Sequence, residues 1–497
     1  MKTILIANRG EIAVRIVRAC RELGIESVAV CSEADRHAPH VVAADRSVTI
    51  GAAPALESYL SIPTIMEAVR ATGADAVHPG YGFLSESPSL ARACEDAGVT
   101  WIGPPSDVIE HMGSKIHARG VMERAGVPVV PGETPADQSD AGVRQALDRV
   151  GLPALIKASA GGGGKGMRRI LQGEAIDDAI GAARREAAQA FGDGTLYVER
   201  LIQHARHVEV QILADQAGHT VHLFERECSV QRRHQKVIEE TPAPGLSAVL
   251  RQRMTEAGVS AARAAGYRNA GTIEFLVDST SSDDPSFFFL EMNTRLQVEH
   301  PVTEAVVGVD LVRAQILVAA GEPLPWTQAQ LSQRGHAIEA RLYAEDPARG
   351  FLPQAGSLAL YREPQWPGVR IDSGVREGDA VTVHYDPLLA KIIAYGETRE
   401  AAIARLTAAL QGFAVLGVPT NLPYLLRILG HARYRRGELD TTFLEDEAAS
   451  LLAVDTPLDL PGPVAAALEL HRRTKTPTVG TTTSGSNPWD VRSGWRP

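Results

Sequence analysis

Side chains of the types that bind metal ions and oxyanions gather in the segment 286–301, SFFFLEMNTRLQVEHP. Its apolar run, 287–290, predicts a strand buried on both faces. Polar and apolar residues then alternate, and in an extended chain successive side chains point to opposite faces. One face would present Glu291, Asn293, Arg295, Gln297 and Glu299. A solvated edge strand alternates in the same way, but the buried run before it favours a strand that opens into an active site.

Each of these polar groups has a definite chemical use. Glu291 and Asn293 offer the hard oxygen ligands that Mg²⁺ prefers. The guanidinium of Arg295 is a planar fork for a small oxyanion. Glu299 is a candidate base.

A second carboxylate is expected beside this segment. NAGTIEFLVD, 269–278, predicts a strand in which Glu274 lies among apolar residues, where a lone carboxylate needs a partner or a metal. Segments 271–278 and 286–293 can pair as a hairpin. Such pairing would place Glu274 near Glu291, and two carboxylates bridged by a divalent metal suit phosphoryl transfer.

Two lysines and a glycine-rich segment predict a phosphate site. Lys115 lies in the first turn of an expected helix, where a cation opposes the helix dipole. Lys157 lies on a strand, 152–159, that leads into AGGGGKGM, 160–167, whose backbone N–H groups can cradle phosphate oxygens. No Ser or Thr follows Lys165, so this is not a Walker A loop. Glycine runs also form linkers and hinges, but the two lysines favour a phosphate lid.

Positive charge is concentrated again at SVQRRHQK. The polar residues crowded there are Gln231, Arg232, Arg233, His234 and Lys236. The cluster is either a solvated face or, in an acidic protein with two proposed phosphate lysines, an anion site, which we favour. Cys228 beside it is a candidate nucleophile, although a buried structural thiol is the simpler interpretation.

Other segments supply the framework. Strands at 3–7 and 27–32 flank a helix at 11–23, the order of a doubly wound α/β unit. The turn NRGEIA is not a dinucleotide fingerprint. HPGYGFLSE, 78–86, follows a strand and is either a plain turn or a ligand-binding turn.

A strand that could pass under a nucleotide base is expected at 196–202. Strands with one polar face are expected at 207–215, where Glu209 lies on that face, and at 336–347, which carries Arg341. HYDPLLAKI, 384–392, lies in a strand-rich region, and a helix is expected at 399–411.

Composition limits the class of protein. The 497 residues, 44% hydrophobic and 22% charged, suggest a globular protein of about three domains. The net charge of −10 argues against nucleic acid as the main partner. No apolar run fits a signal peptide or a membrane span. Four scattered cysteines fit reduced thiols in a cytoplasm.

Together these motifs resemble biotin carboxylase, of the ATP-grasp superfamily, over roughly 1–447. The shared motifs are IANRGEIA, HPGYGFLSE, KASAGGGGKGM, RHVEVQILAD, ECSVQRRHQK, EMNTRLQVEHPVTE and EARLYAEDP. The resemblance implies an α/β fold in three parts. These are a Rossmann-like N-terminal domain (1–112), an ATP-grasp domain (113–330) with a mobile glycine-rich lid at about 131–203, and an α+β C-terminal domain (331–447). Residues 448–497 would form a tail, disordered from about 474.

The resemblance also implies the reaction. ATP phosphorylates bicarbonate to carboxyphosphate, whose CO₂ is captured by the ureido nitrogen of biotin. The expected cofactors are ATP, Mg²⁺ or Mn²⁺, bicarbonate, and biotin carried on a separate protein.

Matched motif by motif, the resemblance assigns roles to individual residues. ATP would be bound by Lys115, Lys157, Gly162, Gly163, Gly164, Lys165, Gly166, Met167, Glu199, Ile202, His207, Gln231 and His234. Metal ions would be bound by Glu274, Glu291 and Asn293, and bicarbonate by Lys236, Arg295, Gln297 and the backbone of Val298. Glu299 would deprotonate bicarbonate, and Arg341 would stabilise the enolate form of biotin close to Tyr81.

The partners implied are a biotin carboxyl carrier protein or domain and a carboxyltransferase subunit, both in trans. We also expect a homodimer or a module of a larger complex, a cytoplasmic location, and no nucleic acid or membrane partner. HYDPLLAKI looks more like the α chains of acyl-CoA carboxylases, yet no Met-Lys-Met biotinylation motif occurs. The sequence would then be a naturally split chain or a fragment. Its Trp489 and Trp495 are either docking residues or part of a tail with no role.

The lid carries Lys165 where arginine is common in the family, a change that keeps the positive charge. Two rivals remain open: another ATP-grasp ligase, such as a carbamoyl phosphate synthetase-like enzyme, and a catalytically silent nucleotide-binding scaffold.

Overall fold

The computed structural model describes residues 1–159, 167–171, 176–233, 235–278 and 286–453. Residues 1–452 form one compact unit. The glycine-rich residues Gly162–Gly166, with Lys165, and His234 lie outside the described residues, as does the expected disorder from about 474. None of the described helices combines the length and apolar character that a membrane span needs.

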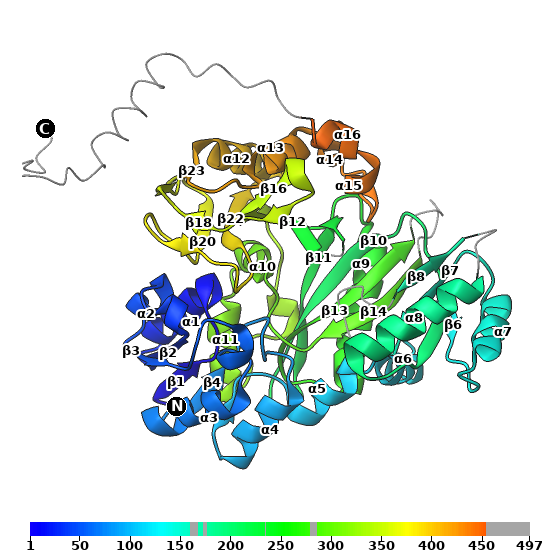
Figure 1. The fold of residues 1–497 in the computed structure, drawn as a ribbon, viewed down its shortest axis with the longest axis horizontal. Helices are drawn as coiled ribbons and strands as arrows, with labels where there is room; N and C mark the ends of the chain where they lie inside the picture. Colours follow the sequence, from blue (N-terminus) through cyan, green and yellow to red (C-terminus); the bar gives the residue numbers. More distant parts are fainter. Residues whose placement is uncertain (160–166, 172–175, 234, 279–285, 454–497) are drawn as a thin grey trace, which may run out of the picture. The chain divides into compact units, whose positions relative to one another are not determined.

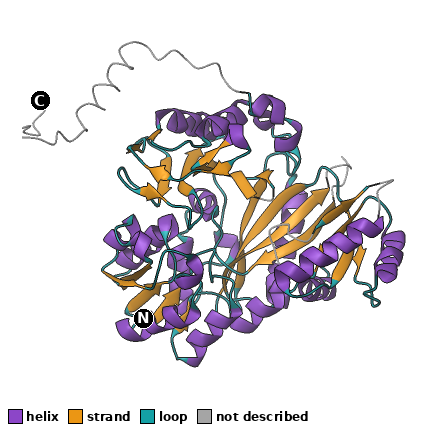
Figure 2. Cartoon of the chain, viewed as in Figure 1, coloured by secondary structure: helices purple, strands orange, loops and turns teal. Residues whose placement is uncertain are grey.

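The N-terminal part is a parallel sheet in the order β3-β2-β1-β4-β5. Its strands are β1 (Thr3–Ile6), β2 (Glu26–Cys31), β3 (Arg46–Thr49), β4 (Ala76–His78) and β5 (Thr100–Trp101). Its helices are α1 (Gly10–Glu22), α2 (Pro39–Ala43), α3 (Ile62–Thr72), α4 (Pro88–Asp96) and α5 (Ser106–Gly113). The apolar run of β1 is wholly buried, because helices cover a parallel sheet. The predicted strand–helix–strand unit is confirmed (Figures 1 and 2).

A small antiparallel sheet follows, in the order β6-β9-β7-β8. Its strands are β6 (Gly132–Glu133), β7 (Ala154–Ala158), β8 (Arg168–Ile170) and β9 (Leu196–Arg200). The helices near it in sequence are α6 (Lys115–Arg124), α7 (Asp140–Val150) and α8 (Ile176–Phe191). Val143, Leu147 and Ile180 pack with its strands as one buried cluster, which corresponds to the predicted lid region.

The largest sheet has eight strands in the order β14-β13-β10-β11-β12-β15-β22-β20. They are β10 (Arg206–Ala214), β11 (Thr220–Arg232), β12 (Gln235–Thr241), β13 (Asn269–Asp278), β14 (Ser286–Asn293), β15 (His336–Tyr343), β20 (Val369–Ser373) and β22 (Leu388–Gly396). β12 pairs with β15, so the sheet continues across the domain boundary predicted at 330/331. The proposed domain limits therefore remain a prediction, while residues on both sides of this boundary share one framework (Figure 1).

The remaining elements complete the compact unit. The helices are α9 (Ala248–Ala264), α10 (His300–Val307), α11 (Leu311–Ala319), α12 (Arg399–Gly412), α13 (Leu422–Gly430), α14 (Ala432–Arg436), α15 (Phe443–Asp446) and α16 (Ala448–Leu451). The short strands are β16 (Glu345–Asp346), β17 (Leu352–Pro353), β18 (Gly356–Ser357), β19 (Leu360–Arg362), β21 (Ala380–Val381) and β23 (Ala414–Leu416). Helix α12 packs on β15 and β22, and the apolar residues between them are buried.

The expected continuous strand through Glu299 is wrong. β14 ends at Asn293, and residues 294–299 form a loop that leads into α10. The amide of Thr294 donates to Glu86 Oε1 (3.2 Å), so it does not continue the ladder with β13. Pro301 lies in the first turn of α10, where its missing N–H costs nothing. The hairpin prediction is confirmed, with Glu274 opposite Glu291.

A buried guanidinium ties the centre of the large sheet to α10. Arg226 on β11 is wholly buried and donates to Glu209 Oε1 on β10 (2.5 Å). It also donates to Gln211 Oε1 (2.8 Å), Thr303 Oγ1 (2.9 Å) and Thr272 Oγ1 (3.2 Å). The Arg226 side chain therefore joins its own strand, β11, to β10, to β13 and to α10, the helix that follows the 294–299 loop.

We predict that Arg226→Met destabilises the protein by about 3–5 kcal/mol, because the buried Glu209 carboxylate would lose the cation that pairs with its Oε1. The midpoint of thermal unfolding, followed by circular dichroism, measures the effect. Arg70→Met is the control, since its exposed pair with Glu67 is worth at most about 1 kcal/mol. Equal midpoints for the two variants would contradict the role given to Arg226.

Candidate active site

The ammonium of Lys236 on β12 holds three carboxylates. Its Nζ lies 2.6 Å from Glu209 Oε2, 2.9 Å from Glu274 Oε1 and 2.6 Å from Glu299 Oε1. Burial by itself would lower the pKa of Lys236, but Cys228 and these carboxylates raise it well above its ordinary value. Lys236 is therefore a permanent positive charge, 11% exposed, where two strands and the 294–299 loop meet.

The predicted metal ligands lie together on the β13–β14 hairpin. Asn293 Nδ2 donates to Glu274 Oε1 (2.8 Å), and His207 Nε2 lies 2.9 Å from Glu274 Oε2. Burial opposes ionisation of Glu274, yet Lys236 and His207 lower its pKa strongly. Burial and then Glu274 raise the pKa of Glu291, whose carboxylate has no hydrogen bond or ion pair with any described residue.

These residues fit a divalent cation. Glu291 offers carboxyl oxygens, which are hard ligands, and it faces Glu274 across the hairpin. A tighter group of possible ligands is His207, Glu209 and Glu274. Arg226 and Lys236 already contact both oxygens of Glu209, whereas the hairpin set includes Glu291, whose carboxyl group has no hydrogen bond or ion pair with any described residue, so the hairpin set stays our predicted metal site.

Arg295 is held in the site by oxygen acceptors from two parts of the chain. Its Nη1 donates to Gln297 Oε1 (2.9 Å), and its Nη2 donates to Asn293 Oδ1 (3.1 Å). Its Nε donates to Glu86 Oε2 (3.0 Å), at the end of the HPGYGFLSE motif. The guanidinium predicted to bind an oxyanion is thus placed beside the metal ligands by the N-terminal part.

Glu299 lies between two cations. Lys236 approaches its Oε1, and Arg341 Nη2 on β15 donates to its Oε2 (2.9 Å). Burial favours the protonated acid, but Lys236, Arg341 and Arg226 hold the pKa of Glu299 well below its usual range. The group predicted to be the base is therefore ionised.

Glu239 on β12 supports Arg341 from the other side. Arg341 Nε donates to Glu239 Oε1 (2.6 Å). Burial raises the pKa of Glu239 to about 7, against the effect of Arg341. Cys228 Sγ lies 3.9 Å from Glu299 Oε1, and burial followed by Glu209 raises the pKa of this thiol well above its ordinary value. A buried thiol, and not a nucleophilic thiolate, fits this environment.

Several predicted nucleotide residues lie on α6 and on the small antiparallel sheet. Lys157 on β7 is buried and paired with Glu199 on β9. Lys115 begins α6, and burial lowers its pKa while Glu291 opposes that effect. Lys115 thus connects the expected phosphate region electrostatically to the metal ligands.

The other predicted contacts are more dispersed. Ile202 is buried in a small cluster with Val130. Met167 and Gln231 are half-buried near the segments that the structure does not describe. The carbonyl of Tyr81 accepts a hydrogen bond from Asn8 Nδ2 (2.8 Å).

Three residues at the centre were not among the predicted site residues. Glu209 was expected on the polar face of its strand, and that alternation was the signal for it. Glu86 ends a motif that had been singled out, but its contact with Arg295 joins residues far apart in the sequence. No local pattern identified Glu239.

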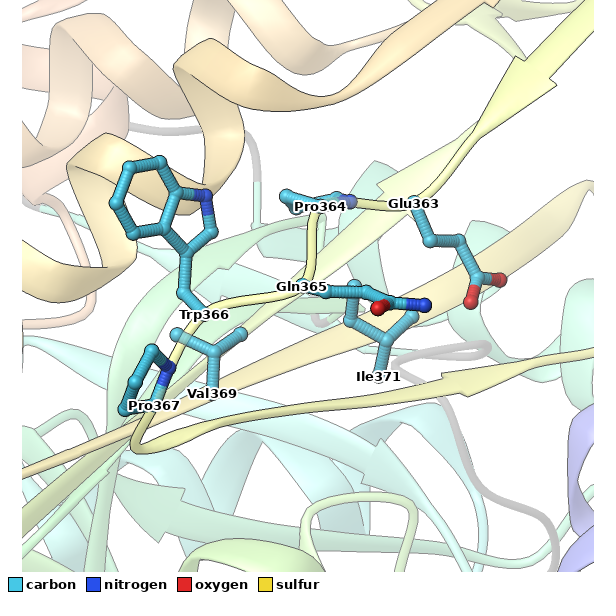
Figure 3. A pocket seen from close by; sticks show the side chains of 7 residues that line it. All are labelled: Glu363, Pro364, Gln365, Trp366, Pro367, Val369 and Ile371. Carbon is cyan, nitrogen blue, oxygen red and sulfur yellow. The ribbon is translucent and has the colours of Figure 1, made fainter. Parts of the chain in front are cut away.

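A surface hollow of about 460 Å³ lies elsewhere, and no predicted site residue lines it (Figure 3). It is lined by Glu363, Pro364, Gln365, Trp366, Pro367, Val369 and Ile371. Trp366 is 54% exposed there.

Family models match three successive parts of the chain. Residues 1–109 match "Biotin carboxylase, N-terminal domain", residues 114–327 match "Carbamoyl-phosphate synthase L chain, ATP binding domain", and residues 339–446 match "Biotin carboxylase C-terminal domain". The fold, the clustered site and the central match define an ATP-dependent ligase.

Relatives of known name narrow the class. Biotin carboxylase 2 of Bacillus subtilis (strain 168) is 50% identical over 442 residues, which are 89% of this chain and 98% of that protein. The mitochondrial methylcrotonoyl-CoA carboxylase subunit alpha of Oryza sativa subsp. japonica is 51% identical over 457 residues, 92% of this chain. The present chain belongs to the biotin carboxylase family. It spans 62% of the length of the rice subunit.

A solved structure agrees over the same range. The biotin carboxylase domain dimer of Hydrogenobacter thermophilus 2-oxoglutarate carboxylase, in complex with MgADP, ADP and bicarbonate, matches with a TM-score of 0.87 and 42% identity. The match covers 91% of this chain and 99% of that one. The α/β fold predicted from the sequence is confirmed.

We predict a pH signature for Glu299. Because its folded-state pKa is depressed, its stabilisation is present above the unfolded value of about 4.3 and is lost as pH falls through the folded value. In the Glu299→Gln variant, the side chain at this position has no carboxyl group to titrate. The stability difference between parent and variant, from thermal unfolding, should be largest at pH 7 and shrink below about pH 4. A difference that is independent of pH would show that Glu299 is not held ionised by its neighbours.

Proposed function

We propose that this chain carboxylates biotin on a carrier protein, using ATP and bicarbonate through carboxyphosphate. The observation that carries the proposal is the Glu299 carboxylate held between Lys236 and Arg341. The arrangement offers cations for a small anion and a carboxylate to take its proton. The structure of similar fold that binds MgADP and bicarbonate supports it.

The bicarbonate half of the site would consist of Lys236, Arg295, Gln297 and the backbone of Val298. A bound anion would compete with Glu299 for the ammonium of Lys236. The pKa of Glu299 would then rise toward its ordinary value, because a neutralising cation is shared. Bound bicarbonate would in this way raise the basicity of Glu299. A carboxylate whose pKa is very low needs such an increase before it can accept a proton from bicarbonate.

The nucleotide half would use Lys115, Lys157 and the 161–166 loop for the phosphates of ATP. Glu199 and Ile202 would hold the adenine, with His207, Gln231 and His234 on the ribose side and Met167 beside the loop. Glu274, Glu291 and Asn293 would hold Mg²⁺ or Mn²⁺, which supplies charge neutralisation at the phosphates. Glu291 supports this assignment because it faces Glu274 across the hairpin and makes no hydrogen bond or ion pair with any described residue.

Biotin would be recognised beside Arg341 and Tyr81. We propose a biotin carboxyl carrier protein and a carboxyltransferase as partners, because the matched rice protein is a subunit of an acyl-CoA carboxylase and extends beyond the matched region. A homodimer is supported by the dimeric domain of similar fold. Several acyl-CoA substrates remain compatible, since that choice belongs to the carboxyltransferase.

We predict that Glu299→Gln lowers kcat for bicarbonate-dependent ADP release by about 10²-fold or more, because the amide cannot accept the proton of bicarbonate. A coupled assay of ADP at saturating ATP measures this. Exposed Glu67→Gln is the matched control and should turn over at the parent rate. A Glu299→Gln enzyme with near-parent kcat would remove Glu299 as the base.

Arg341→Ala should separate the two half-reactions. Its guanidinium would stabilise charge on biotin, so transfer of labelled bicarbonate carbon to biotin should fall by about 10²-fold. Bicarbonate-dependent ATP cleavage should fall less. Equal losses in the two assays would contradict a role at the biotin side of the site.

A further inference from the structure

A buried lysine outside the predicted site holds the loop that carries the base. Lys391 lies on β22, within the HYDPLLAKI motif, and its side chain is wholly buried. Its Nζ donates to the carbonyl oxygen of Val298 (2.8 Å). Since Val298 directly precedes Glu299, this bond fixes the peptide plane from which the Glu299 side chain departs.

The counter-ion of Lys391 comes from the other end of the chain. Glu11, the second residue of α1, is buried, and its Oε1 lies 3.1 Å from Lys391 Nζ. The second carboxylate near this ammonium, Asp372 Oδ2, is farther away, at 3.9 Å. Gly374 packs so closely on α1 that an added Cβ would lie 2.7 Å from the Glu11 nitrogen. The first turn of helix α1 therefore packs against the end of β20, the strand that pairs with the Lys391 strand, β22.

The position of Lys391 relates it to the other predicted parts of the site. Lys391 is the register partner of Arg341 across β15 and β22, so both side chains lie on one face of the sheet. Its Nζ also lies 5.8 Å from the centre of the Tyr81 ring. One buried ammonium thus contacts or neighbours the segments expected to bind bicarbonate and biotin.

We propose that Lys391 is a positioning residue for the bicarbonate subsite, and that Glu11 is the counter-ion that keeps it in place. This proposal rests on the proposed function, because that function assigns bicarbonate binding to the Val298 backbone and proton abstraction to Glu299. Lys391 touches no substrate in this scheme. It acts by donating to the Val298 carbonyl, which orients the backbone expected to bind bicarbonate. The same bond positions the Glu299 side chain relative to Lys236 and Arg341.

The test compares the Michaelis constants of the parent and of Lys391→Met, which keeps an unbranched side chain and removes the ammonium with its charge. Loss of a charge-assisted hydrogen bond to Val298 should raise the bicarbonate KM by about tenfold or more, while the ATP KM changes by less than about twofold. Arg399→Met is the matched control, because it removes a largely buried cation, 11% exposed, from the buried Glu240, away from the 294–299 loop. The control should lower the unfolding temperature and leave the bicarbonate KM unchanged.

The double variant Glu11→Gln/Lys391→Met distinguishes positioning from general stability. Removing both partners leaves no carboxylate at position 11, so the unfolding temperature should recover toward that of the parent. The bicarbonate KM should stay raised, because the Val298 carbonyl still lacks its donor. This variant also decides the question if Lys391→Met alone does not fold.

Several results would overturn the proposal. They are a parent-like bicarbonate KM in both lysine variants, an equal rise in both Michaelis constants, or a bicarbonate KM that recovers together with stability in the double variant. The parent is measured first. If its ADP release does not depend on bicarbonate, the proposed function itself fails, whereas bicarbonate dependence with unaffected lysine variants removes only the role of Lys391.

Discussion

The site depends on one buried ammonium, that of Lys236. Without it, Glu209, Glu274 and Glu299 would repel one another where water cannot screen them. Arg226 balances Glu209 on one side, and Arg341 balances Glu299 on the other. The result is a row of alternating charges across the large sheet, in which removing any member leaves its neighbours uncompensated.

This row explains why the large sheet continues past position 330. β13 and β14, at one edge of the sheet, carry the predicted metal ligands, β12 carries Lys236, and the C-terminal strands β15 and β22 carry Arg341 and Lys391. Groups on hydrogen-bonded strands keep fixed distances, which the proposed reaction between ATP, bicarbonate and biotin would require. The N-terminal part adds Glu86, which contacts Arg295 in the 294–299 loop, and Glu11, which contacts Lys391, the donor to the Val298 carbonyl of that loop.

Local patterns predicted much of this arrangement. Period-two alternation located β10, and two largely apolar segments joined by a turn predicted the β13–β14 hairpin, which brings Glu274 opposite Glu291 as expected. The alternation of polar and apolar residues wrongly predicted a strand beyond Asn293, because this pattern continues through residues 294–299, where the chain has left the sheet. Contacts such as Arg295–Glu86 and Lys391–Glu11 were not predictable, since they depend on packing between segments hundreds of residues apart and not on local spacing.

The release of ADP from ATP and Mg²⁺, measured with bicarbonate and free biotin each added and omitted, tests the carboxylation chemistry most directly. A site in which Glu299 and its cations activate bicarbonate must release ADP only when bicarbonate is present, and faster when biotin is added. ADP release that is indifferent to bicarbonate, or tight ATP binding with no turnover under any of these conditions, would contradict it.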